Sequence, residues 1–203
     1  MKKLILASNN QKKIKEIKEI LQREDIEVLS LKDINLNIDV VEDGNTFEEN
    51  ALKKSREIYK ELIKREFNNF IVMSDDSGLS VDYLNGEPGV YSARYAGEHG
   101  NDKLNNKKLL ENLKGVKNED RKAKFICHIA LVDSNDKYIG VRGEVEGYIL
   151  EEERGSSGFG YDPLFFYEPL KKSFAELSSE EKNKISHRGK ALNIIKDKII
   201  ELL

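Results

Sequence analysis

The sequence predicts a mixed α/β fold in which an antiparallel section interrupts strands that alternate with helices. Short apolar runs alternate with helical periodicity in the N-terminal part, two long strand-like segments joined by a turn follow, and helical periodicity returns at the end. The central hairpin disfavours a purely parallel sheet. A chain of 203 residues fits one large domain, or one domain with two lobes around a cleft. We expect residues 1–203 to form a single domain.

The N-terminal segment has the pattern of a strand, a helix and a second strand. Leu4–Ala7 is an apolar run typical of a strand buried on both faces. Residues Asn10–Arg23 then predict an amphipathic helix, and a strand around Ile26–Leu31 follows. The apolar positions of the helix are Ile14, Ile17 and Leu21.

A long helix and a short strand come next. Thr46 is placed to cap a helix that runs to about Phe67, and Glu49 completes a capping box. The residues expected on its inward face are Phe47, Ala51, Ile58 and Leu62. Phe70–Met73 predicts a strand that ends abruptly in a polar turn, Ser74–Gly78.

The middle of the chain changes its period. Gly86–Gly89 predicts a turn and Asp102–Leu113 a helix. Lys122–Val132 and Tyr138–Ile149 predict two long strands, joined as a hairpin at Ser134–Asp136.

The C-terminal segment begins with a glycine-rich loop. Gly155–Gly160 contains three glycines and two serines, which indicates unusual backbone angles. Leu164–Tyr167 predicts a short strand, Ser178 with Glu181 caps a helix, and Ser186 starts the closing helix. The inward positions of that last helix are Ala191, Ile195, Ile199 and Leu202.

Composition limits the possible partners and the compartment. Lys and Arg number 34 against 37 Asp and Glu, so a net charge of −3 argues against nucleic acid or an anionic membrane as a partner. Apolar runs such as Leu4–Ala7 and Phe125–Val132 fall far short of the ~20 residues of a membrane span. We expect no secretory signal, because only a four-residue apolar run follows Lys2 and Lys3. A single cysteine, Cys127, excludes an intramolecular disulfide and a cysteine-rich zinc site. We therefore expect a cytoplasmic protein.

The first group of polar residues with chemical potential is Ser8-Asn9-Asn10-Gln11-Lys12-Lys13, between the first strand and the first helix. Backbone N–H groups at a helix start, with ammonium groups nearby, can bind an anion. An ordinary turn with solvated lysines has the same pattern. The Gly-x-x-x-x-Gly-Lys pattern is missing, which argues against a P-loop kinase.

The second group is acidic and combines Glu42 with Asp75 and Asp76. Magnesium prefers one or two carboxylates together with phosphate oxygens, and ligands gather at the carboxyl ends of strands in α/β folds. A solvated acidic turn is the alternative interpretation.

Two further groups lie in the C-terminal part. In Phe159-Gly160-Tyr161-Asp162, an aromatic ring can stack on a base and the carboxylate of Asp162 can accept hydrogen bonds from N–H groups of the base. The alternative interpretation is a loop whose aromatic residue packs on the core. This loop does not match the Gly-x-Ser-x-Gly motif of a nucleophile elbow, because Phe159 stands two residues after Ser157, which excludes a serine hydrolase. Lys182, His187 and Arg188 can donate hydrogen bonds to carbonyl or phosphate oxygens. The alternative interpretation is that they are solvated surface residues. We expect His99 and His128 to be structural.

The order of these motifs along the chain resembles that of the inosine-triphosphate pyrophosphatase family, also called non-standard purine nucleoside-triphosphate pyrophosphatases, over nearly the whole chain. The stretches that carry the resemblance are Leu6–Lys13, Thr46–Ala51, Ser74–Leu79, Pro88–Tyr95, Phe159–Pro163 and Glu181–Arg188.

The resemblance implies a fold and an activity. The fold would be an elongated mixed sheet with flanking helices and two lobes around a substrate cleft, and the assembly a homodimer. The activity would be Mg²⁺-dependent hydrolysis of ITP, dITP and XTP to the monophosphate and pyrophosphate.

The resemblance also implies roles for individual residues. Asp76 would be the catalytic base and would hold magnesium with Glu42, although Glu48 or Glu49 could serve instead of Glu42. The residues implied to contact the phosphates are Ser8, Asn10, Lys13 and Lys54, and their neighbours Asn9, Gln11 and Lys12 are implied to bind the substrate. Ser77 would lie beside the substrate, and Arg94 could reach a phosphate. The residues implied to surround the base are Phe159, Gly160, Tyr161, Asp162, Lys182, His187 and Arg188.

Three other functions fit less well. A related pyrophosphatase for pyrimidine or modified nucleotides would have the same fold, and a nucleotide-binding module would lack turnover. A nucleic-acid-binding protein is disfavoured by the net charge.

Overall fold

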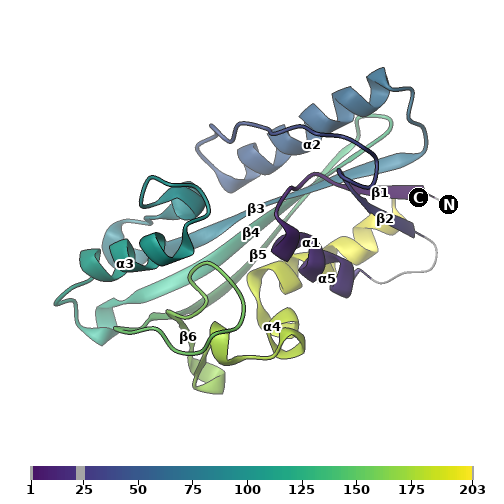
Figure 1. Ribbon diagram of the computed structural model, residues 1–203. Helices are drawn as coiled ribbons and strands as arrows, with labels where there is room; N and C mark the ends of the chain where they lie inside the picture. The colour runs from purple at the N-terminus through teal and green to yellow at the C-terminus, as the bar shows by residue number, and fades with distance from the viewer. Residues whose placement is uncertain (1, 22–25, 203) are drawn as a thin grey trace. The chain divides into compact units, whose positions relative to one another are not determined.

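The structure is a computed structural model that describes residues 2–21 and 26–202. Its strands form one seven-stranded sheet in the order β2-β1-β3-β4-β5-β6-β7. The strands are β1 (Lys2–Leu6), β2 (Ile26–Ser30), β3 (Phe70–Val81), β4 (Lys122–Asp133), β5 (Tyr138–Ile149), β6 (Phe165–Tyr167) and β7 (Lys172–Ser173). β1 is parallel to β2 and β3, whereas β6 is antiparallel to both β5 and β7. The predicted mixed α/β fold is confirmed, and Figure 1 shows β3, β4 and β5 side by side.

Helices lie between some of these strands and after the last one. The α-helices are α1 (Gln11–Ile20), α2 (Phe47–Lys64), α3 (Asp102–Asn112), α4 (Ser179–Ile185) and α5 (His187–Ile200). The 3₁₀ helices are η1 (Asp82–Leu84), η2 (Gly89–Arg94), η3 (Asn118–Asp120), η4 (Glu168–Leu170) and η5 (Phe174–Glu176).

The chain forms two compact units. Unit 1 comprises residues 1–76, 127–142 and 190–203, and unit 2 comprises residues 77–126 and 143–189. β3, β4 and β5 each begin in one unit and end in the other. The expectation of one domain over residues 1–203 stays a prediction.

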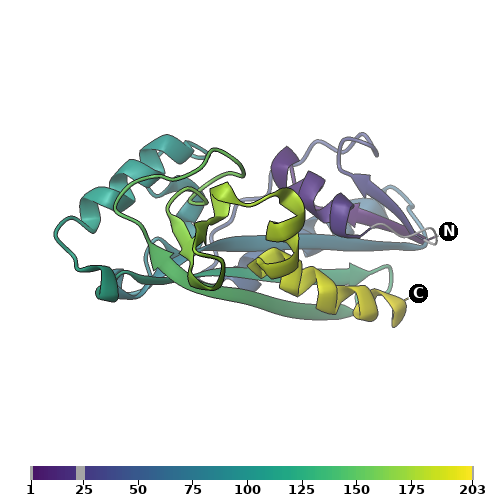
Figure 2. The same cartoon turned by 90° about the horizontal axis from the view of Figure 1, so that it is seen from below.

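The core of unit 1 lies on both faces of its strands, because side chains alternate along each strand. Leu4 and Leu6 belong to a cluster with buried residues of α1 and α5, whereas Ile5 and Ala7 belong to a cluster with Ile58 and other residues of α2. Two helices therefore cover one face and α2 covers the other. Within unit 1, α5 packs on β4, because Ala191 and Ile195 share a cluster with Ile129, and Figure 2 shows this helix beside the strand.

Unit 2 has its own core, built around aromatic side chains. The ring centroids of Phe125 and Phe165 are 4.5 Å apart, and those of Phe165 and Phe174 are 4.8 Å apart. Leu109 of α3 and Leu177 are buried in the same cluster. This core supports the loop that precedes β6.

The helix starts agree with the capping signals of the sequence. Thr46 and Glu49 form a capping box at the start of α2, and Ser178 does the same for α4. Ser186 Oγ accepts the backbone N–H of Gly189 at 3.1 Å, which caps α5. Two predicted helix ends differ: α2 stops at Lys64, three residues before Phe67, and the predicted end of the first helix at Arg23 lies outside the described residues.

The prediction of a polar turn at Ser74–Gly78 is wrong, because this stretch lies inside β3. β3 lies between β1 and β4, so pairing to a neighbouring strand holds the backbone extended where the local composition favours a turn. The pairing with β1 ends at Leu6 and Met73. The polar residues of β3 therefore follow the carboxyl end of β1, although they do not end their own strand.

Candidate active site

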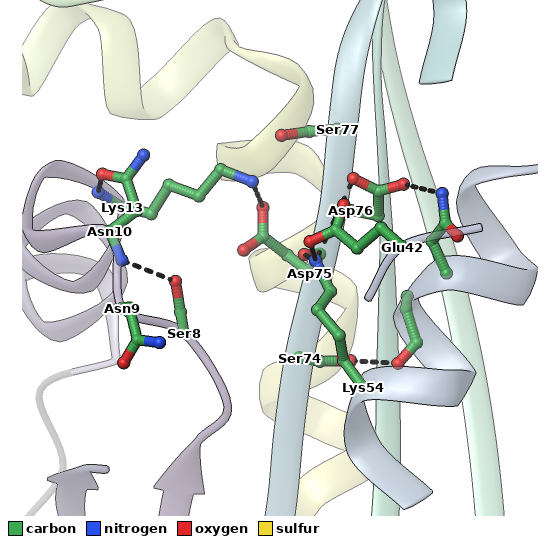
Figure 3. Close-up of polar contacts among 12 residues, drawn as sticks. Ser8, Asn9, Asn10, Lys13, Glu42, Lys54, Ser74, Asp75, Asp76 and Ser77 are labelled. Atoms are coloured by element: carbon green, nitrogen blue, oxygen red, sulfur yellow. Dashed lines mark hydrogen bonds and ion pairs between the residues drawn. The ribbon is translucent and has the colours of Figure 1, made fainter. Parts of the chain in front are cut away.

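Two adjacent buried aspartates form the centre of the site in unit 1. Asp75 is 2% exposed and Asp76 is 5% exposed. Because they are neighbours in a strand, their carboxylates point to opposite sides of β3, as Figure 3 shows. Lys13 extends from α1 to Asp75, with 3.1 Å between Nζ and Oδ2. The two aspartates therefore face different partners and are not interchangeable.

Asp76 faces the first turns of α2. Asn50 Nδ2 donates to Asp76 Oδ2 at 3.0 Å, and Lys54 Nζ lies 4.0 Å from Asp76 Oδ1. The same ammonium donates to Glu42 Oε1 at 2.8 Å and to the backbone oxygen of Asp75 at 2.7 Å. One buried lysine thus lies against the carboxylates of both Glu42 and Asp76.

The surroundings separate the pKa values of these two carboxyl groups. Burial raises the pKa of Asp76 above 3.8, although the charge of Lys54 opposes this. Burial also acts on Glu42, but the charge and hydrogen bond of Lys54 outweigh it, so the pKa of Glu42 lies below 4.5. Burial alone would lower the pKa of Lys54, but the charges of Asp76 and Glu42 raise it above 10.5. Paired groups with diverging pKa values are typical of sites with acid–base chemistry.

The alternative metal ligands are engaged elsewhere. Glu49 Oε2 accepts the backbone N–H of Thr46 in the capping box, and Glu48 Oε1 accepts from the Tyr138 hydroxyl at 2.9 Å. Within residues 2–21 and 26–202, no group of three or more His, Cys, Asp or Glu side chains could hold a metal ion. The chemistry of Glu42 and Asp76 nevertheless suits a magnesium ion that takes its remaining ligands from phosphate and water.

The segment Ser8–Lys13 forms a structured start to α1. Asn10 Oδ1 accepts the backbone N–H groups of Lys12 at 3.0 Å and Lys13 at 3.2 Å, and the N–H of Asn10 donates to Ser8 Oγ at 3.2 Å. Asn9 Nδ2 donates to the backbone oxygen of Ile38 at 3.1 Å. Two of the N–H groups expected to bind an anion are therefore used in the cap. The exposed side chains of this segment are Asn9, Asn10, Gln11 and Lys12.

A second cluster lies in unit 2, around the glycine-rich loop. Asp162 Oδ2 accepts from Lys182 Nζ at 2.7 Å and from the backbone N–H of Phe159 at 2.8 Å. Lys182 Nζ also lies 4.7 Å from the centre of the Phe159 ring. A Cβ at Gly158 would lie 2.1 Å from Asp162 Oδ2, and its φ of +78° also favours glycine. These contacts fix the loop and half-bury Phe159.

His187 and Arg188 complete this cluster at the start of α5. Arg188 is 2% exposed, Nη2 donates to Ser77 Oγ at 2.9 Å, and its guanidinium lies 5.8 Å from the Phe159 ring centre. The His187 ring stacks on Phe125 with 4.8 Å between centroids. Both residues are built into the fold, so a solvated surface position does not describe them.

Tyr161 and Gly160 are held by contacts within unit 2. The Tyr161 hydroxyl donates to the backbone oxygen of Ser92 at 2.8 Å, and burial raises its pKa above 10. The N–H of Gly160 donates to Asp102 Oδ2 at 2.8 Å. Contacts of these two residues with a base stay predictions.

Asn50, which the structure places against Asp76, has no role among the predictions made from the sequence. One signal could have indicated it. Asn50 and Lys54 are four residues apart, so they lie on one face of α2, beside the apolar positions Ala51 and Ile58. Polar residues on an inward helix face require polar partners, and Asp76 is one of them.

Carboxylates that can hold a metal ion and lysines that can neutralise phosphate charge are the kinds of group that phosphoryl-transfer enzymes use. The chain belongs to the Ham1 family, whose pattern matches residues 4–198.

Named relatives are similar over nearly their full length. A dITP/XTP pyrophosphatase of Clostridium perfringens is 59% identical, with 100% of both chains covered. A dITP/XTP pyrophosphatase of Clostridium tetani is 54% identical, with 98% of this chain and 96% of that one covered. Among solved structures, the Ham1 protein of Staphylococcus aureus has a TM-score of 0.86 at 42% identity, with 98% of this chain and 99% of that chain covered.

Proposed function

We propose that this protein hydrolyses non-standard purine nucleoside triphosphates, namely ITP, dITP and XTP, to the monophosphate and pyrophosphate, and so removes them from the nucleotide pool. The observation that carries the proposal is the cluster of Glu42, Asp75 and Asp76 with Lys13 and Lys54, in which both aspartates are buried. The names of the C. perfringens and C. tetani relatives support the same reaction.

We assign the metal and the catalytic base to unit 1. Glu42 and Asp76 would hold Mg²⁺, which would neutralise phosphate charge when bound. Asp76 would also accept a proton from the attacking water, since its carboxylate lies at the centre of the cluster. Asn50 Nδ2 orients one oxygen of Asp76 at 3.0 Å.

The lysines of unit 1 would bind the polyphosphate. Lys13 and Lys54 pair with carboxylates within the protein, and phosphate oxygens would compete for the same ammonium groups. The other residues assigned to phosphate binding are Ser8, Asn9, Asn10, Gln11 and Lys12. Their position at the start of α1 supports this assignment, because the helix dipole favours an anion there.

We assign recognition of the base to unit 2. Phe159 would stack on the base, and Arg188 and His187 would donate to the oxygen at its six position. Lys182 and Asp162 would hold the loop of Phe159, Gly160 and Tyr161, because their ion pair also binds the Phe159 N–H. Ser77 would lie beside the substrate, where it already accepts from Arg188.

The assembly and the compartment are part of the proposal. We expect a homodimer, which light scattering of the purified protein tests. No helix among the described residues is long and apolar enough to cross a membrane. Free nucleoside triphosphates are the substrate, so we expect the protein to act in the cytoplasm.

A steady-state panel with product identification tests the function. ITP, dITP, XTP, GTP, ATP and pyrimidine triphosphates are compared with Mg²⁺ and with EDTA. Pyrophosphate release from ITP, dITP and XTP, abolished by EDTA, is the expected result. Preference for a pyrimidine triphosphate would indicate a related pyrophosphatase, and binding without pyrophosphate release would indicate a module without turnover.

A further inference from the structure

Asn50 is a polar side chain that is fully enclosed. It is 0% exposed and lies in the first turn of α2, where Oδ1 accepts the backbone N–H of Gly44 at 2.8 Å and Nδ2 donates to Asp76 Oδ2 at 3.0 Å. A backbone N–H can only donate, so the atom facing Gly44 must be the amide oxygen. The NH₂ group therefore faces Asp76, and the hydrogen-bond network allows one orientation of the amide.

The two partners of Asn50 belong to the two segments that carry the carboxylates of the site. Gly44 follows Glu42 by two residues in a stretch without helix or strand, whereas Asp76 lies in β3. A segment without regular structure depends on such side-chain contacts for its position. The amide thus links the backbone next to Glu42 directly to the carboxylate of Asp76.

Only a glycine at position 44 leaves room for this contact. A Cβ at Gly44 would lie 2.7 Å from Asn50 Oδ1 and 2.9 Å from the Cβ of Glu49. Glycine therefore allows the backbone next to Glu42 to approach the Asn50 amide closely, and a methyl group would push them apart.

We propose that Asn50 is a positioning residue that sets the separation and orientation of Glu42 and Asp76 and so determines how tightly the pair binds a divalent cation. The inference rests on the proposed function, in which these two carboxylates hold the metal. Asn50 acts through Asp76 directly and through Gly44 on the segment of Glu42. Loss of a group that orients metal ligands typically lowers metal affinity about 10- to 100-fold.

The experiment measures binding of Mn²⁺ alone to the full chain, by the relaxation of water protons, without a nucleotide. The variants are Asn50→Ala, Gly44→Ala and the double variant. Ser55→Ala is the matched control, because Ser55 is also 0% exposed on α2 and makes buried hydrogen bonds, to Ser74 Oγ at 2.8 Å and to the backbone oxygen of Ala130 at 3.1 Å. Thermal unfolding of each variant, followed by circular dichroism, checks the fold.

Asn50→Ala and Gly44→Ala are each expected to weaken Mn²⁺ binding by about tenfold or more. Ser55→Ala should stay within about twofold of the wild type. The double variant should lose less affinity than the product of the two single losses, because the nearest atom that a Cβ at Gly44 would meet, Asn50 Oδ1 at 2.7 Å, is then gone, while the Cβ of Glu49 at 2.9 Å remains. Non-additive effects of this kind would show that both residues act through one contact.

Unchanged Mn²⁺ affinity in a folded Asn50→Ala protein would overturn the inference. An equal loss of affinity in Ser55→Ala would also overturn it, and so would a loss in the double variant equal to the product of the two single losses. If Asn50→Ala fails to fold, the Mn²⁺ affinity of Gly44→Ala tests the inference by itself, since this variant retains the Asn50 side chain. Asp76→Asn separates this inference from the proposed function. If Asp76→Asn binds Mn²⁺ normally, the proposed metal site is wrong; if it loses binding while Asn50→Ala does not, only the role of Asn50 fails.

Discussion

Replacing Asp76 by Asn removes a charge from the proposed site while keeping the shape of the side chain. The amide oxygen introduced by Asp76→Asn could still accept from Asn50 Nδ2, which lies 3.0 Å from Asp76 Oδ2. The loss therefore concerns the negative charge and the ability to accept a proton. We expect turnover to fall roughly 100-fold or more, which corresponds to about 2.7 kcal/mol of activation free energy.

Stability should respond in the opposite direction. Burial raises the pKa of Asp76 above its unfolded value of 3.8, so the folded state holds the proton more tightly than the unfolded state. This contribution to stability is present below pH 3.8 and is lost as the pH rises through the folded pKa. At pH 7.5 Asp76→Asn should therefore unfold with the same or a higher free energy than the wild type.

Asp75→Asn is the matched control, because it changes the neighbouring residue in the same way. Asp75 pairs with Lys13 at 3.1 Å, and its side chain is 1% exposed, so removing its charge should lower the free energy of unfolding. Steady-state hydrolysis of ITP and urea unfolding measure both effects in both variants. Near-normal turnover in Asp76→Asn together with a large loss in Asp75→Asn would refute the choice of Asp76.

Three further predictions address other parts of the molecule. Lys13→Ala should raise KM and lower kcat for ITP together, since the phosphate charge persists in the transition state; unchanged kinetics would leave Lys13 only as the partner of Asp75. Arg188→Ala should lower activity on ITP much more than on ATP. Adenine offers no oxygen at the six position, so a buried donor facing it is left unpaired at a cost of about 1–3 kcal/mol. Phe159→Ala should lower both activities alike, because stacking does not depend on the groups at the edge of the base. Equal losses in Arg188→Ala would disprove its role in selectivity. Burial lowers the pKa of His128 below 6.5, so below pH 6.5 the unfolded chain binds a proton that the folded chain resists. In urea unfolding, the free energy of unfolding should decrease as the pH is lowered below 6.5, and it should decrease less steeply in His128→Gln. Equal slopes of free energy against pH in the two proteins would contradict this.

Most elements could be predicted from the sequence because their signals are local. The capping box of Thr46 and Glu49 and the positions Ile14, Ile17 and Leu21 mark helices by patterns that span a few residues. The family resemblance of the motifs is likewise a property of the sequence, and the match of residues 4–198 confirms it.

The polar stretch of β3 shows where local reasoning failed. Ser74, Asp75 and Asp76 in succession have the composition of a turn, yet they are buried in the middle of a strand. Strand pairing holds the backbone, and Lys13, from α1, and Asn50, from α2, contact the side chains. None of these partners is near β3 in the sequence.

The sequence by itself determined most of the elements, the family and the residue types of the site. Only the tertiary structure decided that Glu42, and not Glu48 or Glu49, lies with Asp76 against Lys54. It also decided that Asn50 links Asp76 to Gly44. The physical reason is that helical and strand periodicity depend on neighbours a few residues apart. Burying a charge depends on partners that the fold brings together from distant segments.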